Sequence, residues 1–138
     1  MKLLVPIDGS GFSLNAVEHA AKMANAFGDT EVDLVYVIVY EPNFMDSGRV
    51  LQELGSETAK KVMTEATALF KKKSNAPLKE IVKTGNSAAS IITDIAENKK
   101  YDGIVMGSKG KSNLQRFLVG SVSNRVVHHA PCTVTLVR

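Results

Sequence analysis

The run from Glu31 to Tyr40 is the feature that most limits how this chain can fold. A strand with one face in water alternates apolar and polar residues, but this run is nearly continuous and rich in β-branched side chains. Its apolar and aromatic members are Val32, Leu34, Val35, Tyr36, Val37, Ile38 and Val39. The run therefore predicts a strand that is buried on both faces, as in a parallel sheet with a helical layer on each side.

Similar apolar runs alternate with helical patterns along the rest of the 138-residue chain. Strands are predicted over residues 2–7, 31–40, 78–82, 103–106 and 133–137. Four helices are predicted between them, the last one over residues 121–129. The order βαβαβαβαβ predicts one α/β domain over residues 1–138, with an open parallel sheet, right-handed crossovers and helices on both faces.

Two of the predicted helices have an apolar face that can be assigned to residues. The first helix is expected to have Ser13 as its N-cap and Gly28 just after its end, and to bury residues at helical spacing, namely Val17, Ala20, Ala21, Ala24 and Phe27. The second is a long amphipathic helix whose expected buried stripe consists of Leu51, Leu54, Thr58, Val62, Ala66, Leu69 and Phe70.

Composition and charge exclude several classes of protein. The chain is 44% hydrophobic and 22% charged, which is typical of a globular domain, and no segment has the length of a membrane span. Pro6 and Asp8 interrupt the first apolar run before a signal-peptide core would be complete. Cys132 is the single cysteine, so no internal disulfide can form, and we expect a cytoplasmic protein without a membrane partner.

The basic and metal-ligating residues do not form convincing sites. The net charge is +3, and the dense basic run, Lys71 to Lys73, falls at a predicted helix end without any interleaved aromatic residue. We therefore expect no specific nucleic-acid site. His128 and His129 are adjacent, so on a helix they point about 100° apart and are poorly placed to share a metal ion.

Three glycines follow the fourth predicted strand and suit a loop that binds an anion. The spacing is Gly107-x2-Gly110-x9-Gly120-Ser121, and the last two residues open a predicted helix. Backbone amides approach an anion closely where no Cβ intervenes, and a helix N-terminus adds partial positive charge. A Walker A loop would need glycine at Val105, and a dinucleotide fingerprint would need glycine at Leu14, so neither of these motifs is present.

Asp8 directly follows the first predicted strand and faces the glycine loop if the first and fourth strands are neighbours. Ligands of open α/β sheets bind at the carboxyl ends of the strands where the strand order reverses. A carboxylate repels a triphosphate but accepts hydrogen bonds from an amine or a hydroxyl, so Asp8 is expected at the nucleoside end. Lys109, Lys111 and Arg116 could pair with phosphate oxygens, although solvated loop charge is an equal alternative for them.

Three segments together resemble the universal stress protein family. They are Val5-Pro6-Ile7-Asp8-Gly9-Ser10, the glycine loop with its following serine, and Ala130-Pro131-Cys132. The resemblance covers essentially the whole chain, and this glycine spacing followed by Ser or Thr is typical of the nucleotide-binding branch. The resemblance implies a Rossmann-like sheet of the adenine nucleotide alpha hydrolase-like type, with strand order 3-2-1-4-5. It also implies ATP as the ligand, with Mg²⁺ or Mn²⁺ as a candidate bridging cation.

The resemblance also assigns parts of the ligand to positions in this chain. Pro6, Ile7 and Asp8 match the adenine side, and Val37 matches an apolar contact from the second strand. The junction of sugar and phosphate corresponds to Met106 and Gly107, and the phosphate-holding groups correspond to Gly110, Gly120, Ser121 and Val122. With Lys109 and Arg116 these residues form the candidate binding set, which contains no catalytic residue and no metal ligand.

The expected function is that of a nucleotide-responsive stress sensor or regulatory module with at most slow ATP hydrolysis. Gln115 is the one Glu or Gln in the loop that could position a water. Two alternatives remain open at this point: an adenine-nucleotide hydrolase or adenylyl-transfer enzyme, and an interaction module for another ligand such as a cyclic nucleotide. The resemblance further implies a homodimer through the last strand and an unknown protein partner, although Thr133 and Thr135 depart from the family's more apolar last strand.

Overall fold

The computed structural model of the chain describes residues 1–40, 48–110 and 119–138. Five parallel strands form one sheet in the order β3-β2-β1-β4-β5, which confirms the predicted strand order. The strands are β1 (Lys2–Pro6), β2 (Glu31–Val39), β3 (Leu78–Gly85), β4 (Gly103–Gly107) and β5 (Thr133–Val137). The helices between them are α1 (Gly11–Phe27), α2 (Gly48–Lys73), α3 (Ala88–Asn98) and α4 (Ser121–His129).

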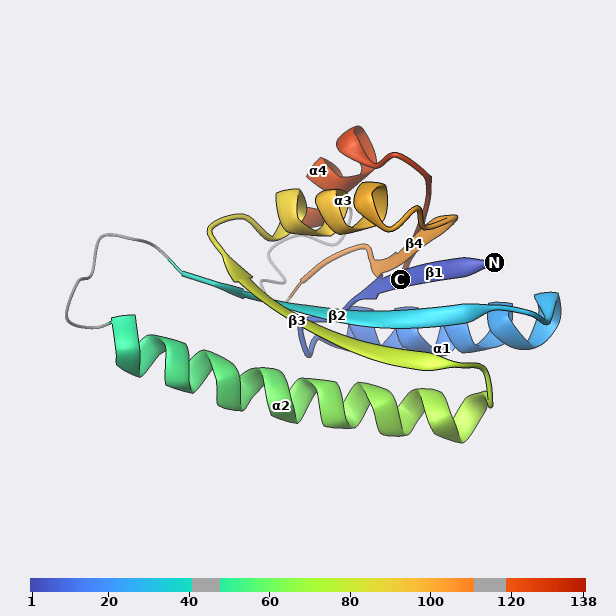
Figure 1. The fold of residues 1–138 in the computed structure, drawn as a ribbon, viewed down its shortest axis with the longest axis horizontal. Helices are drawn as coiled ribbons and strands as arrows, with labels where there is room; N and C mark the ends of the chain where they lie inside the picture. Colours follow the sequence, from blue (N-terminus) through green and yellow to red (C-terminus); the bar gives the residue numbers. More distant parts are fainter. Residues whose placement is uncertain (41–47, 111–118) are drawn as a thin grey trace.

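The helices cover the sheet in two layers, with α1 and α2 on one face and α3 and α4 on the other (Figure 1). Each layer closes its own apolar core, because successive side chains of a strand point to opposite faces. Leu34 of β2 packs in the α1–α2 core, and its neighbour Val35 packs in the α3–α4 core. The continuous apolar run in β2 is therefore explained by burial on both faces, as the sequence predicted.

The start of α1 differs from the sequence prediction. Ser10, and not Ser13, is the N-cap: its hydroxyl accepts a hydrogen bond from the Ser13 backbone N–H at 3.1 Å. The prediction was wrong because the turn after β1 is tighter than expected, so that the helix begins at Gly11. At the other end Gly28 follows the helix with φ of 66°, and Phe27 is 67% exposed rather than buried.

The apolar face of α2 also differs from the predicted stripe. Leu54 is 55% exposed, whereas the described core positions of this helix are Ala59, Val62, Met63, Ala66 and Phe70. Leu54 lies about 140° around the helix from Ala59, and the sheet-facing position near it is Gly55. A Cβ on Gly55 would lie 2.8 Å from Cγ2 of Ile38, so the helix approaches β2 closely there. The side chain of Leu51 lies outside the described residues.

Strand β3 is longer than its apolar pattern predicted. Backbone pairing with β2 continues to Val39↔Gly85, so β3 extends three residues beyond Val82. Side-chain pattern alone could not indicate this extension, because the last residues of an edge strand are solvent-exposed. Within the described part of the chain, none of the helices combines the length and apolar character needed to cross a membrane.

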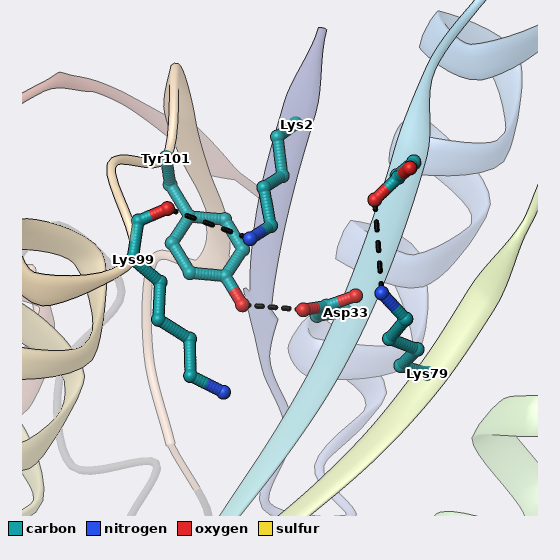
Figure 2. A network of polar contacts seen from close by, with 6 residues as sticks. Lys2, Asp33, Lys79, Lys99 and Tyr101 are labelled. Atoms are coloured by element: carbon teal, nitrogen blue, oxygen red, sulfur yellow. Dashed lines mark hydrogen bonds and ion pairs between the residues drawn. The ribbon is translucent and has the colours of Figure 1, made fainter.

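A polar network closes the α3–α4 face at the amino-terminal end of the sheet (Figure 2). The Tyr101 hydroxyl donates a short hydrogen bond to the buried Asp33 carboxylate of β2. The Lys2 ammonium lies 4.5 Å from the centre of the Tyr101 ring and donates to the Lys99 carbonyl at 3.4 Å. These contacts fix the turn between α3 and β4 against β1 and β2.

Candidate functional site

A cavity of about 390 Å³ opens at the carboxyl ends of the central strands. It lies where the strand order reverses, because β1 connects through α1 to β2 on one side and has β4 as its neighbour on the other. Eleven of the twelve residues of the predicted binding set line it, namely Pro6, Ile7, Asp8, Val37, Met106, Gly107, Lys109, Gly110, Gly120, Ser121 and Val122. Their role in binding stays a prediction, and Arg116 lies outside the described residues.

The cavity has one apolar part and one polar part. Apolar residues of β2, β4 and α3, together with the residue after β1, supply the apolar part, namely Val35, Val37, Met106, Ile92 and Ile7. The polar part consists of the Asp8 carboxylate, the glycine loop after β4 and the first turn of α4. Such a cavity suits a ligand with a flat apolar group at one end and an anionic group at the other.

The turn after β1 fixes the orientation of the Asp8 carboxylate. Its Oδ1 accepts a hydrogen bond from the Ser10 N–H at 2.9 Å, and the intervening Gly9 has φ of 82°, a conformation that favours glycine. The second oxygen, Oδ2, lies 2.9 Å from the place where a Cβ on Gly110 would be. The turn therefore brings the carboxylate against the glycine loop, with one oxygen already used by the backbone.

Gly107 and Gly120 mark the two places where the loop approaches other backbone. A Cβ on Gly107 would lie 2.8 Å from the carbonyl carbon and from Cβ of Phe12, so only glycine lets β4 end so close to α1. A Cβ on Gly120 would lie 3.2 Å from Cα of Lys109, because the two ends of the loop approach each other closely there. The glycine spacing is thus accounted for by contacts at its first and last positions.

The N-terminus of α4 faces the cavity without a side-chain cap. Gly120 is the N-cap residue and makes no side-chain hydrogen bond, and Ser121, Val122 and Ser123 line the cavity. The first backbone N–H groups of a helix have no partner within the helix and carry partial positive charge. The first turn of α4 can therefore donate hydrogen bonds to an anion in the polar part of the cavity.

Comparison with known proteins identifies the chain. The model of the universal stress protein family matches residues 1–138. The chain belongs to the universal stress protein family. A universal stress protein of Methanocaldococcus jannaschii is 37% identical over 145 residues, an alignment that covers 99% of this chain and 81% of that protein.

Solved universal stress proteins share the fold of this chain. UspA from Lactobacillus plantarum superposes with a TM-score of 0.88 at 29% identity and covers 100% of this chain and 97% of its own. Two more distant structures contain an adenine nucleotide. A universal stress protein in complex with cAMP has a TM-score of 0.77 at 22% identity, with 100% and 97% coverage. The protein from Archaeoglobus fulgidus in complex with dAMP has a TM-score of 0.72 at 21% identity, with 100% and 98% coverage.

In this universal stress protein, one of the three basic residues predicted to meet phosphate lies among the described lining residues of the cavity. Lys109 lines the cavity next to Gly110, whereas Lys111 and Arg116 lie outside the described residues. Burial, and then the negative charge of Asp8, raise the pKa of Tyr36 of β2. Among the described residues, no group of three or more His, Cys, Asp or Glu side chains could hold a metal ion.

Five further residues line the cavity that sequence reasoning did not place there, namely Ser13, Val35, Ala88, Ile92 and Ser123. Val35 and Ile92 have the apolar character of any core residue, so nothing in the sequence separates them from the core. Ser13 and Ser123 lie in the first turns of α1 and α4, close to predicted site residues. Each is a serine in the first turn of a helix that follows a glycine turn, and this pattern could have indicated both of them from the sequence.

Proposed function

We propose that this universal stress protein binds ATP in the cavity and acts as a nucleotide-responsive sensor or regulatory module. The observation that carries the proposal is the meeting of two half-sites in one cavity. The β1 turn contributes a fixed carboxylate, and the glycine loop with the first turn of α4 contributes backbone donors. A nucleotide needs an apolar wall for its base and backbone N–H groups for its phosphates. Neither half-site alone provides both.

The chemistry of the cavity favours an adenine nucleotide. The wall formed by Ile7, Val37 and Met106 suits a purine base. Asp8 accepts hydrogen bonds from a base amine or a sugar hydroxyl, and the phosphates lie against Gly110, Gly120 and Ser121. The cAMP and dAMP complexes of distant relatives support this class of ligand.

A Mg²⁺ or Mn²⁺ ion accompanies ATP in this proposal and neutralises charge on the phosphates. Asp8 is the one carboxylate among the described lining residues, so the chain provides no cage of acidic side chains. Mg²⁺ in nucleotide sites is commonly held by the phosphates and water with few protein ligands. The ion is therefore expected to enter with the nucleotide.

Hydrolysis of ATP is expected to be slow. Acid–base assistance would need a side chain within hydrogen-bond reach of the attacking water. The described lining residues include no Glu, Gln or His, Asp8 is assigned to the base and sugar, and Gln115 lies outside the described residues. We expect turnover below about 1 per second, under the median of ordinary enzymes. A faster rate that disappears on Asp8→Ala would favour a hydrolase or adenylyl-transfer function instead.

We also propose that the protein acts in the cytoplasm as a homodimer and signals to a protein partner. In the monomer β5 is an edge strand, paired only with β4, and its Val134 and Leu136 are half-buried. A second copy could continue pairing along this edge. Light scattering of wild type and of Val134→Pro tests the interface. The Val137 carbonyl accepts from β4, so residues 133, 135 and 137 of β5 pair with β4 and the Val134 N–H faces the free edge, where proline removes it. An unchanged mass of the variant would contradict it.

Calorimetric titration with ATP, AMP and cAMP tests the proposed ligand. We expect ATP to bind the wild type, and Gly120→Val to lose binding because its side chain would meet the backbone of Lys109. The φ of −62° at Gly120 is open to valine, so the fold should persist. Gly11→Val is the matched control, since a Cβ there meets nothing within 4 Å. Binding of cAMP but not ATP would assign the site to a cyclic nucleotide.

A further inference from the structure

We infer that Ser123 is a positioning residue for the phosphate end of the cavity, acting through the Gly107 carbonyl. The inference rests on the proposed nucleotide function and concerns how the first turn of α4 is held in place. Ser123 is 3% exposed, and its Oγ donates a hydrogen bond to the Gly107 carbonyl oxygen at 2.8 Å. The bond joins the last residue of β4 to the third residue of α4.

The direction of this bond separates Ser123 from a group that binds phosphate through its side chain. A serine hydroxyl has one O–H donor, and here it is used by the Gly107 carbonyl. Phosphate oxygens only accept hydrogen bonds at neutral pH, so the Oγ has no donor left for them. Its effect on a phosphate must therefore pass through the backbone that it orients.

Two backbone hydrogen bonds complete the frame that Ser123 joins. The Ser108 N–H, on the same peptide as the Gly107 carbonyl, donates to Val137 of β5 at 2.8 Å. The Gly120 N–H donates to the Ser108 carbonyl at 2.7 Å. Both polar groups of the peptide between residues 107 and 108 are therefore hydrogen-bonded. The Ser108 carbonyl in turn accepts from the Gly120 N–H at the start of α4.

The frame sets the distance between the end of β4 and the α4 N-terminus. The N–H groups at the start of α4 are useful to an anion only if they are already in place when it arrives. Removal of the Ser123 hydroxyl leaves the buried Gly107 carbonyl without this donor and loosens α4 against β4. Binding of phosphates should therefore weaken, while contacts to the base and sugar are unaffected.

A pair of variants with nearly equal volume tests the inference. Ser123→Thr keeps the hydroxyl and Ser123→Val replaces it with a methyl group, so their difference reports on the hydrogen bond. The affinities of each protein for ATP and for adenosine are measured by calorimetry, and thermal unfolding is followed alongside. We expect Ser123→Val to bind ATP about tenfold more weakly than Ser123→Thr, the effect of losing one buried hydrogen bond. Adenosine should bind both variants equally.

Each result has a defined meaning. Equal ATP affinity of the two variants would overturn the role of Ser123 and leave the proposed function intact. Equal loss of ATP and adenosine affinity would show a general structural role and also overturn it. Absence of ATP binding by the wild type would overturn the proposed function and this inference together.

A measurement on the wild type keeps the inference testable if Ser123→Val does not fold. The inference requires the Gly120 amide to be held before any nucleotide binds, so its hydrogen exchange should be slow in the ligand-free protein. Exchange of the Gly120 amide at the rate of an unprotected amide would show that the frame is open, and would overturn the inference.

Discussion

The Asp8 carboxylate and Gly110 touch across the cavity, with Oδ2 of Asp8 2.9 Å from the position that a Cβ on residue 110 would occupy. The contact joins the loop after β1 to the loop after β4, which are about 100 residues apart in the chain. Oδ1 is held by the Ser10 N–H, so the carboxylate cannot simply rotate away from an added side chain. Gly110 is therefore required here because Asp8 occupies the space beside it.

The contact predicts that substitutions at Asp8 and Gly110 are coupled. Gly110→Ala should weaken ATP binding about tenfold, because the new methyl group displaces the carboxylate or the loop. The double variant Asp8→Ala, Gly110→Ala should bind ATP almost as tightly as Asp8→Ala alone, because the carboxylate that the new methyl group would meet is already absent. Calorimetry on the four proteins gives a coupling energy, expected at about 1 kcal/mol. Additive effects within about 0.3–0.5 kcal/mol would show that the two residues act independently.

Gly107→Ala is expected to damage the fold itself, in contrast to Gly110→Ala. Its Cβ would lie 2.8 Å from backbone and side-chain carbons of Phe12, and backbone cannot turn aside as a side chain can. We expect a loss of about 1–3 kcal/mol in the free energy of unfolding, as for other overpacked sites. Urea unfolding measures it, with Gly11→Ala as the control in open space. Unchanged stability of Gly107→Ala would mean that α1 and β4 are packed less tightly than described.

The hydrogen bond from Tyr101 to Asp33 predicts a stability effect far from the cavity (Figure 2). Tyr101→Phe removes the hydrogen-bond donor of the buried Asp33 carboxylate. The other oxygen of Asp33, Oδ1, has no hydrogen-bond partner among the described residues. We expect the free energy of unfolding to fall by about 1–3 kcal/mol. Tyr40→Phe is the matched control, because Tyr40 is half exposed. ATP affinity should not change, and a change would reveal coupling between the two ends of the sheet.

The two shifted tyrosines predict how stability depends on alkaline pH. Burial is the largest cause that raises the pKa of both Tyr36 and Tyr101, and hydrogen bonding to Asp33 raises that of Tyr101 further. The folded protein keeps these protons where the unfolded chain loses them, near pH 10. The contribution to stability is therefore complete below about pH 10 and is lost as the pH rises above it.

Urea unfolding between pH 8 and pH 11 measures this dependence. The free energy of unfolding of the wild type should fall steeply above about pH 10, and Tyr101→Phe should flatten that fall. Tyr36→Phe is expected to have the smaller effect, since hydrogen bonding contributes only at Tyr101. An equally steep fall in Tyr101→Phe would show that other groups cause the alkaline loss.

Much of the fold was predictable from local patterns in the sequence. The β-branched run of β2, the helical spacing after it and the turn residues between elements depend on interactions within a few residues. For that reason the bounds of α4 and β5 agree with the prediction, and the strand order follows from the family resemblance. The glycine spacing and its following serine indicated where the cavity would form.

Residues whose role depends on distant parts of the chain were beyond that reasoning. Leu54 looked like a core residue and is exposed, because close packing of Gly55 on Ile38 sets which side of α2 meets the sheet. Phe27 is exposed although its spacing matches the buried face of α1. Asp33 is the polar exception in an apolar run, and its partner Tyr101 is 68 residues away.

The sequence by itself determined the alternation of strands and helices, the family and the neighbourhood of the cavity, because these depend on local periodicity and on short motifs. Only the tertiary structure decided that Asp8 lies against Gly110 and that Ser123 holds the Gly107 carbonyl. The first contact exists because β1 and β4 are neighbours in the sheet, which brings together loops that are far apart in the chain. The second exists because α4 packs back against the end of β4. Spacing along a sequence carries no direct record of such distances.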